Sequence, residues 1–579
     1  MNRRAFLSVL GGGLLAAPLP AGCQHAGMGA RPIDVDSAAL PPALPDPVNN
    51  LMSGSNPIPE NLGGATINVG SGGEALYTAL GLPTGKTGPT PCLNADGSHK
   101  GNTYVCPPGA VYSWMRLPAT TGAGWTCIRS GSPTLPPFGT RIMGTGPEPN
   151  RSDASKLFKV ATAGPHQPDQ GACFTIPPGS NGWRIVGAEM GPLDLAHGPG
   201  GYGLLHIGGS RVCVERCWVH GYTENINVIR GIYVTSELAR VFAEDIQIWD
   251  SWVGEIKHDD ADNQAIYLGL NRRAHVENCH IESSCENFMV GSQGWGQYGE
   301  HITLKRSHIY KPPKWFQFLM DGVTRNPIWD GGGPNRLWSM KNLLETKVAR
   351  LLLVEGCVFE NMWKGPAFVH NTQDLSLTDV TWQHNIFINC LGGWSIGIQM
   401  ATWNERVKIY NNAWINMPGM AGWHTWTAKD MWVEHNTFAG MIRYTVPDGR
   451  PEMLGWVGGP NFNRYTFKHN IIGFRGGGPA FFDSGIPGAN INVILPDRAW
   501  AENAIYSTAT APEPSFTPYV SVAAAGINTD GTLTANSPLR RGNVGYFGTD
   551  GKDIGVDFVA LAAAMGRPDT VDARGPKGK

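Results

Sequence analysis

Ile409-Tyr410-Asn411-Asn412-Ala413-Trp414 is one copy of a six-residue pattern that recurs along the chain. Apolar residues stand at its first and sixth positions, and a small or amide residue stands at its fourth. The ten copies begin at Ile185, Val214, Ile248, Val276, Leu304, Val354, Trp382, Ile409, Val433 and Phe467. The fourth positions are Ala188, Cys217, Ser251, Cys279, Ser307, Cys357, Asn385, Asn412, Asn436 and Asn470. Recurrence at intervals of a few tens of residues indicates a repeat architecture.

The spacing of the two apolar positions predicts a corner inside each copy. Residues on one face of an uninterrupted strand alternate with period two, so positions one and six cannot share a face. A bend near the fourth position removes the conflict. Asparagine tolerates left-handed backbone angles, and stacked amides hydrogen-bond along a column of parallel strands.

Further short apolar strands are predicted past these corners, at residues 265–268, 287–290, 315–318 and 367–369. Short strands, sharp corners and a regular repeat predict an all-β fold, a single-stranded right-handed parallel β-helix over residues 62–505. Its coils stack about 4.8 Å apart. The open sheet ends need covering. Helical apolar spacing over residues 73–80 predicts a short N-terminal capping helix, and residues 506–579 are expected to form an irregular C-terminal cap and tail with a helix at 557–565.

Composition narrows the class of protein but names no partner. The chain has 579 residues, with 45 Lys and Arg against 47 Asp and Glu, which gives a net charge of −2. Nucleic-acid binding through a basic face is therefore not expected. With 76 Gly and 44 Pro and only 16% charged residues, the composition disfavours helix bundles and coiled coils.

The first 23 residues are predicted to be an export signal. Arg3-Arg4 precedes an apolar stretch too short to span a bilayer, and it is similar to a twin-arginine signal. Pro20-Ala21-Gly22-Cys23 is similar to a lipobox, so a lipid anchor at Cys23 is an open alternative. Residues 24–61 are predicted to be a flexible linker. The expected location is the periplasm, the outer membrane through the anchor, or the outside of the cell, with no transmembrane segment and a monomeric state.

Several stretches together resemble a known family. They include Trp125-Thr126-Cys127-Ile128-Arg129-Ser130, Asp262-Asn263-Gln264-Ala265-Ile266, Glu286-Asn287-Phe288-Met289-Val290-Gly291, Val354-Glu355-Gly356-Cys357-Val358-Phe359-Glu360 and Asp550-Gly551-Lys552-Asp553-Ile554-Gly555. The chain resembles exported bacterial right-handed β-helix repeat proteins of the pectate-lyase-like superfamily over most of residues 66–560. The resemblance implies this fold and export, and a superfamily dominated by polysaccharide lyases, glycoside hydrolases and epimerases. The motifs of polygalacturonases and of typical pectate lyases are missing from the sequence.

Two repeats are longer than the others, and their extra residues are the best candidates for a functional site. Binding and catalytic residues often lie on loops that a rigid scaffold such as a solenoid holds in place. One holds residues 257–262, and the other contains residues 320–341. Alignment of the second strands puts Gln264, Glu286 and Lys314 in one column, followed by Lys341 if the strand near residue 343 continues it.

A mixed column of this kind suits β-elimination on a uronate polysaccharide. The reaction needs a cation that neutralises the sugar carboxylate and a base that removes the neighbouring proton. Glu286, Lys314, Lys341 and Arg325 are the catalytic candidates, and Gln264 is a substrate-binding candidate. A solvated salt-bridge ladder is the alternative interpretation of the same column.

Asp259, Asp260 and Asp262 are candidate calcium ligands, because calcium takes six to eight oxygens. The same residues also fit an ordinary polar loop. A glycoside hydrolase that uses Asp262 and Glu286 is the enzymatic alternative, and the two carboxyls could have either the spacing for retention or the wider spacing for inversion.

Aromatic side chains supply the remaining candidates for contact with an extended polysaccharide. Sugar rings stack on indoles, so the loop tryptophans Trp295, Trp329, Trp338 and Trp363 are candidate subsites. His370 is a further candidate, or an edge histidine bonded to the backbone. A non-catalytic glycan-binding scaffold or adhesin therefore stays open as a third function.

Overall fold

The structure is a computed structural model. It describes residues 62–82, 92–120, 122, 124–142, 153–161, 172–191, 203–221, 227–235, 241–291, 299–319, 324–329, 337–362, 367–370, 377–390, 394–396, 404–416, 423–439, 455–473, 482–483, 499–506, 515–528 and 530–566.

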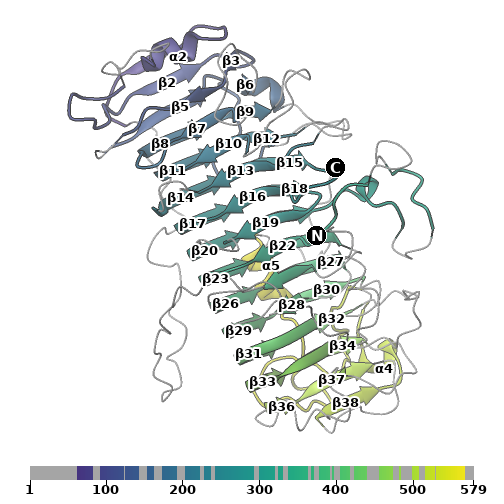
Figure 1. Ribbon diagram of the computed structural model, residues 1–579. Coiled ribbons are helices and arrows are strands. Elements are labelled where there is room, and N and C mark those ends of the chain that lie inside the picture. The colour runs from purple at the N-terminus through teal and green to yellow at the C-terminus, as the bar shows by residue number, and fades with distance from the viewer. Residues whose placement is uncertain are drawn as a thin grey trace, which may run out of the picture.

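Three ladders of parallel strands run along the molecule, and we name them A, B and C (Figure 1). Over most of its length each coil adds one strand to A, then one to B, then one to C. Ladder A contains β4 (Met115–Arg116), β7 (Phe174–Ile176), β10 (Leu205–Ile207), β13 (Arg230–Val234), β16 (Gln264–Leu268), β19 (Glu286–Val290), β22 (Leu344–Thr346), β25 (Phe368–His370), β28 (Trp394–Ile396), β31 (Trp423–Glu434), β33 (Gly455–Lys468) and β35 (Phe482–Asp483).

Ladder B contains β1 (Thr66–Asn68), β2 (Thr103–Cys106), β5 (Thr126–Ser130), β8 (Asn181–Val186), β11 (Ser210–Glu215), β14 (Ala243–Trp249), β17 (Asn271–Glu277), β20 (Gly299–Lys305), β23 (Ala349–Glu355), β26 (Leu377–Gln383), β29 (Asn404–Tyr410) and β36 (Ala499–Ala501). Between β29 and β36, the long strands β31 and β33 run through both A and B.

Ladder C contains β3 (Val111–Ser113), β6 (Phe158–Ala161), β9 (Ala188–Gly191), β12 (Trp218–His220), β15 (Trp252–Ile256), β18 (His280–Ser283), β21 (His308–Tyr310), β24 (Val358–Met362), β27 (Ile386–Cys390), β30 (Ala413–Ile415), β32 (Thr437–Phe438), β34 (Ile471–Gly473), β37 (Asn503–Tyr506) and β38 (Phe516–Tyr519). The chain is thus a right-handed parallel β-helix, and the predicted fold class is confirmed.

The six-residue pattern forms the corner between ladders B and C. In the quoted copy, Ile409 belongs to β29 and Trp414 to β30. The bend was predicted at the fourth position of the pattern, but the residue with left-handed backbone angles occupies the third. In the quoted copy this residue is Asn411, with a φ of 53°. The fourth-position asparagine instead contributes its side chain.

Those side chains form a hydrogen-bonded column inside the corner. Asn412 is buried, and its Oδ1 accepts from the backbone N–H of Asn385 at 3.0 Å and from its side-chain amide at 2.9 Å. Its own amide donates to the Asn436 Oδ1 at 3.0 Å and to the Trp382 carbonyl at 3.1 Å. The column continues to Asn503, which marks an eleventh corner beyond the ten that the sequence predicted.

Apolar side chains at the sixth position stack behind this column in the same register. The rings of Phe359, Phe387, Trp414 and Phe438 follow one another at centroid distances of 4.8, 4.4 and 4.6 Å. They belong to a continuous core that runs from Val69 to Phe516. Offset aromatic stacking adds to the stabilisation that burial provides.

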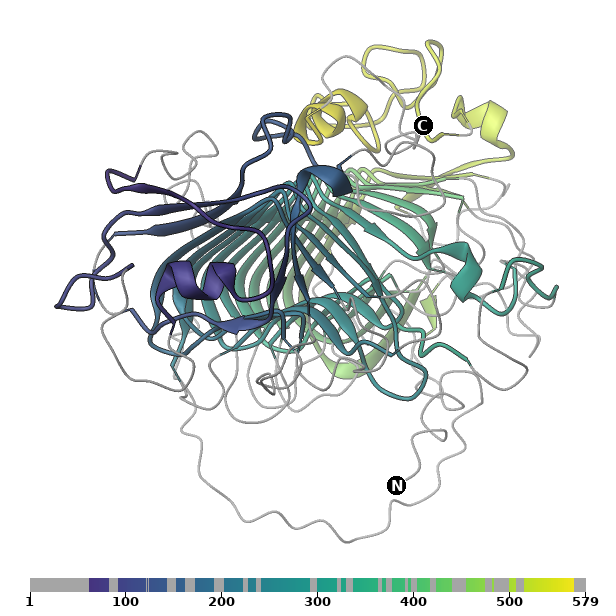
Figure 2. The ribbon, with the colours of Figure 1, turned by 90° about the horizontal axis from the view of Figure 1, so that it is seen from above.

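Helices occupy the two ends of the described chain. The predicted N-terminal helix is present as α2 (Ala75–Leu80), which buries Leu76 and Leu80 in the core across the near end of the stack in Figure 2. Short helical turns η1 (Ala154–Lys156) and η2 (Pro313–Trp315) interrupt the connections. In the described residues, no helix is long and apolar enough to cross a bilayer.

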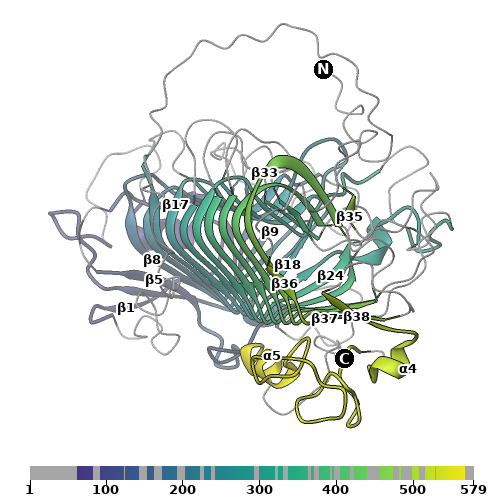
Figure 3. The same ribbon diagram turned by 90° about the horizontal axis from the view of Figure 1, so that it is seen from below.

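The C-terminal segment contains α4 (Val522–Ala525) and α5 (Phe558–Ala564), the latter where a helix was predicted. Helix α5 lies beside the stack, outside the corner between ladders B and C (Figure 3). There Leu561 packs with Ile386 and Ala413, and the Asn411 amide donates to the Asp557 carbonyl at 3.1 Å. The segment therefore covers part of one side of the β-helix in addition to its end.

We expect Asn412→Ala to lower the free energy of unfolding by about 1–3 kcal/mol, because buried partners on both neighbouring coils lose a hydrogen bond. Asn412→Ser should cost less, since serine already caps the same column position at Ser251 and Ser307. Denaturant unfolding of the two variants measures both effects. Equal stability of Asn412→Ala and the wild type would contradict the role of the column.

Candidate functional site

The predicted column along ladder A is correct for its first two members. Gln264 and Glu286 are register partners in the pairing of β16 with β19. The next strand of this ladder is β22, because Phe288 pairs with Leu344. Residues 315–318 are therefore not a ladder strand, and the predicted position of Lys314 in this column is wrong.

Two successive prolines explain the departure. Pro312 and Pro313 come two and three residues after the end of β21, and proline has no N–H to donate to a ladder. The chain turns into η2 and leaves the stack until β22. Lys314 accordingly lies against ladder C, where its Nζ donates to Glu255 Oε1 at 3.2 Å.

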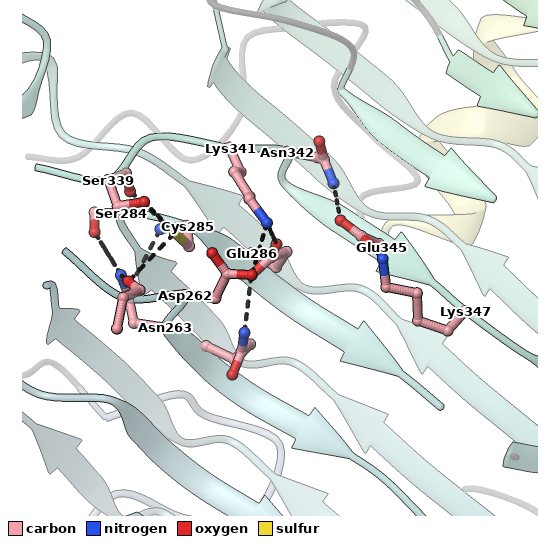
Figure 4. Close-up of polar contacts among 12 residues, drawn as sticks. Asp262, Asn263, Ser284, Cys285, Glu286, Ser339, Lys341, Asn342, Glu345 and Lys347 are labelled. Carbon is pink, nitrogen blue, oxygen red and sulfur yellow. Dashed lines mark hydrogen bonds and ion pairs between the residues drawn. The ribbon is translucent and has the colours of Figure 1, made fainter. Parts of the chain in front are cut away.

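Lys341 was predicted to follow in the column, but the pairing of Phe288 with Leu344 puts it one residue out of register. Its ammonium group nevertheless meets Glu286 and also Asp262, as Figure 4 shows. Lys341 Nζ lies 2.8 Å from Asp262 Oδ2 and 3.0 Å from Glu286 Oε1. Gln264 donates to Glu286 Oε2 at 2.8 Å and accepts from Arg230 Nε at 3.0 Å. Three consecutive coils thus supply one polar group, which we name the Lys341 cluster: Asp262, Gln264, Glu286 and Lys341.

The turn from ladder C to ladder A holds these side chains in place. Asn263 is buried, and its side chain accepts from the Cys285 backbone N–H at 3.2 Å and donates to Ser284 Oγ at 2.9 Å. The Cys285 thiol in turn donates to Ser339 Oγ at 3.0 Å. These contacts, also drawn in Figure 4, fix the backbone on either side of Asp262, Glu286 and Lys341.

Burial and charge act in opposite directions within the cluster. The Glu286 side chain is 2% exposed, whereas Lys341 is 32% and Asp262 48% exposed. Burial raises the pKa of Glu286, and the Lys341 ammonium opposes that rise. Burial lowers the pKa of Lys341, but the Glu286 and Asp262 carboxylates hold it well above its ordinary value. Lys341 is therefore a cation at physiological pH and not a base.

The shared ammonium also sets the separation of the two carboxylates. Both Asp262 and Glu286 place an oxygen within 3.0 Å of the same nitrogen. The closest oxygens of the two side chains are consequently less than about 6.5 Å apart, which is the shortest carboxyl separation in inverting glycosidases. The arrangement is compatible with the separation of roughly 5 Å that retaining glycosidases use.

A buried lysine, which sequence reasoning missed, supports the turn before Glu286. Lys311 is fully buried, and its Nζ donates to the carbonyls of Ser283 and Ser284 at 2.9 Å each. It also donates to the Cys285 carbonyl and to Asn287 Oδ1. Burial lowers the pKa of Lys311 to about 7. No pattern in the sequence marks this lysine, because its acceptors come from another coil.

A second carboxylate pair, also missed, lies on ladder C. The Glu255 backbone N–H donates to Glu282 Oε1 at 3.3 Å. Burial raises the pKa of Glu282 to about 7, and burial together with the Glu282 charge raises the pKa of Glu255. Lys257, which is fully buried, lies 3.4 Å from Glu255 Oε2 with its Nζ over the Trp338 ring at 5.0 Å.

The aspartates predicted to bind calcium are spread along their loop. Asp259 Oδ1 accepts from Asn227 Nδ2 at 2.7 Å, Asp260 is exposed, and Asp262 is paired with Lys341. Within the described residues, the one group of three or more His, Cys, Asp or Glu side chains close enough to share an ion lies elsewhere. Calcium binding by this loop remains a prediction.

The remaining candidate residues, which are Arg325 and the aromatic side chains, lie in different surroundings. Exposed Arg325 lies over the Trp329 ring at 5.2 Å. Trp338 is 3% exposed in a cluster with Trp315, Phe316 and Met340, so its indole is not presented to solvent. His370 ends β25. Trp295 and Trp363 lie outside the described residues.

Among known proteins, the chain is similar only to solved structures. No model of a known protein family and no curated protein matches the chain. Among 18 matching chains of solved structures is an alginate lyase from Paenibacillus sp. str. FPU-7, at 12% identity and a TM-score of 0.29, with 69% of this chain and 95% of that chain covered. The Family 28 exopolygalacturonase of Yersinia enterocolitica matches at 9% and 0.31, with 76% and 77% covered. PfbA, a surface adhesin of Streptococcus pneumoniae, matches at 9% and 0.32, with 72% and 83% covered.

We expect Glu282 to contribute stability that falls as pH rises from about 4.5 to about 7. Its folded-state pKa of about 7 lies above the unfolded value, so the folded chain binds more protons within that window. The contribution is fully present below the window and lost above it. Glu282→Gln should remove this contribution, so the unfolding free energy of the variant minus that of the wild type should rise with pH across the window, and a difference that does not change with pH would contradict the assignment.

Proposed function

We propose that the protein cleaves a polysaccharide by hydrolysis at the Lys341 cluster, with retention of configuration. The observation that carries the proposal is the pair of carboxylates, Asp262 and Glu286, that share one ammonium group. Two carboxyls about 5 Å apart are what a retaining glycosidase needs. The extended β-helix offers neighbouring coils on which a long polymer can lie.

The two carboxylates differ in environment, and this suits different roles. Burial raises the pKa of Glu286 against the opposing Lys341 ammonium, and a raised pKa suits a general acid, so Glu286 would donate a proton to the leaving glycosidic oxygen. Asp262 is nearly half exposed and would attack the anomeric carbon to form a glycosyl ester. Deprotonated Glu286 would then remove a proton from water, and the resulting hydroxide equivalent would hydrolyse the ester, which restores both carboxyl groups.

Lys341 acts electrostatically in this scheme. Its ammonium lies between the two side chains and stabilises the charge that Glu286 acquires when it loses its proton. Gln264 orients Glu286 through the 2.8 Å hydrogen bond, and Arg230 orients Gln264. Arg230 is itself held over the rings of Tyr233 and Tyr267, at 4.4 and 4.8 Å.

β-Elimination on a uronate polymer is the second candidate, favoured by the partly exposed cation. Lys341 could neutralise a sugar carboxylate if that group displaced Asp262 from it, and calcium held by Asp259, Asp260 and Asp262 would assist. The raised pKa of Lys341 assigns the lysine to neutralisation and leaves proton removal to another group. Either activity would act on a polymer outside the cytoplasm, so export, through the signal and anchor proposed for residues 1–23, belongs to the same proposal.

We expect purified protein to release new reducing ends from one member of a panel of neutral and uronate polysaccharides. No ultraviolet absorbance of unsaturated uronate ends should accompany them, and the first product seen by proton NMR should keep the anomeric configuration of the substrate. Unsaturated ends would instead establish the lyase. Retention of glycan with neither product would establish a binding scaffold or adhesin.

Asp262→Asn should abolish release of reducing ends with almost no change in melting temperature, because Asp262 is exposed. Glu286→Gln should abolish it as well. Glu405→Gln is a matched control that removes a carboxylate paired with Arg406 and Lys429 on ladder B. Full activity of Asp262→Asn would contradict the proposed nucleophile.

A further inference from the structure

Two histidines and an aspartate converge outside the corner between ladders B and C, far along the chain from the Lys341 cluster. His435 and His469 occupy the third position of successive corners, and their rings stack at 4.8 Å. Asp550 reaches them from the C-terminal segment: its Oδ2 lies 2.7 Å from His435 Nε2 and 3.8 Å from His469 Nδ1. The three ligand atoms all lie within 4.8 Å of one another.

The other ring nitrogens are already bound to acceptors. His435 Nδ1 lies 3.3 Å from the Gly555 carbonyl, and His469 Nε2 contacts Glu502 Oε2. Glu502 is held in turn by the Thr549 backbone N–H at 3.1 Å and by its hydroxyl at 3.0 Å. A carbonyl and a carboxylate accept hydrogen bonds only, so these two ring nitrogens can carry the hydrogens of neutral imidazoles when the opposite nitrogens bind a metal ion.

The site-facing nitrogens of both rings point toward one Asp550 oxygen, to which His435 Nε2 is hydrogen-bonded at 2.7 Å. A metal ion bound by these three atoms would replace the proton of that hydrogen bond and take a lone pair from each ring nitrogen. A histidine whose far nitrogen donates to a carboxylate or a carbonyl is the usual outer arrangement around a bound metal ion, since that hydrogen bond fixes the tautomer and raises the basicity of the ligand.

We propose that His435, His469 and Asp550 bind a zinc ion, with Glu502 and the Gly555 carbonyl as its outer hydrogen-bond partners. Two imidazoles and one carboxylate suit zinc better than calcium, which prefers oxygen alone. The two histidines are nearly buried, with 6% and 8% of their side chains exposed. Asp550, at 28%, leaves a path by which the ion and a completing water enter.

The ion would fasten the C-terminal segment to the β-helix. One ligand comes from that segment and two come from consecutive coils, next to the backbone hydrogen bond from Gly555 to the His469 carbonyl at 2.8 Å. Because a bound ligand stabilises the state that binds it, zinc should stabilise the docked segment and with it the fold. The site is built on the opposite side of ladder C from the turn that carries the Lys341 cluster, so its role is separate from the proposed cleavage.

The test is zinc titration of the full chain after EDTA treatment, followed by calorimetry and elemental analysis. We expect one zinc per chain with micromolar or tighter affinity and a melting temperature that rises with zinc. Cobalt in place of zinc should give the visible absorption of a site with imidazole ligands. His469→Asn and Asp550→Asn should each abolish stoichiometric binding, and Glu502→Gln should weaken it about 10- to 100-fold.

Asparagine is compatible with these corners, because Asn278 and Asn411 hold the same position with φ values of 51° and 53°. His384→Asn is the matched control: His384 occupies an equivalent corner with a φ of 57° but lies beside Glu355, at 3.7 Å. It should bind zinc like the wild type. Absence of micromolar binding by the wild type, or equal binding by His469→Asn and the wild type, would overturn the proposal and assign the cluster to a protonated hydrogen-bond network.

Discussion

In-register parallel pairing between coils is the constraint on which the rest of the structure depends. Each strand lies about 4.8 Å from its equivalent in the next coil, so a residue at one position of the repeat contacts its counterparts above and below. The asparagine column and the aromatic stack behind it both use this spacing. An amide can give and accept along the column at once, which satisfies the backbone groups that the corner leaves unpaired.

The same constraint places charges where they interact. Gln264, Glu286 and Lys341 come from three coils and meet because the turns between ladders C and A lie one above another. The connection of residues 311–343 lengthens one turn without breaking the ladder on either side, since β19 pairs directly with β22. A solenoid accepts such an excursion because each coil contacts only its neighbours.

Two fully buried lysines lie near this turn. Lys257 and Lys311 are fully enclosed, and their surroundings supply carbonyls or carboxylates in place of water. Removing an ion from water is costly unless such partners are present. Concentration of buried, shifted groups at one turn is typical of functional sites, although structural ion networks produce it too.

The sequence by itself determined the ladder, its corner and the adjacency of Gln264 and Glu286, because a repeated pattern of apolar and amide residues can be satisfied only by stacking. It also contained the paired corner histidines, His435 and His469, in equivalent positions. It could not show that Pro312 and Pro313 remove Lys314 from the column, that Lys311 lies under the turn, or that Asp550 folds back onto the histidines. Those contacts join residues with no shared period, and so they depend on the path of loops and of the C-terminal segment, which only the tertiary structure decides.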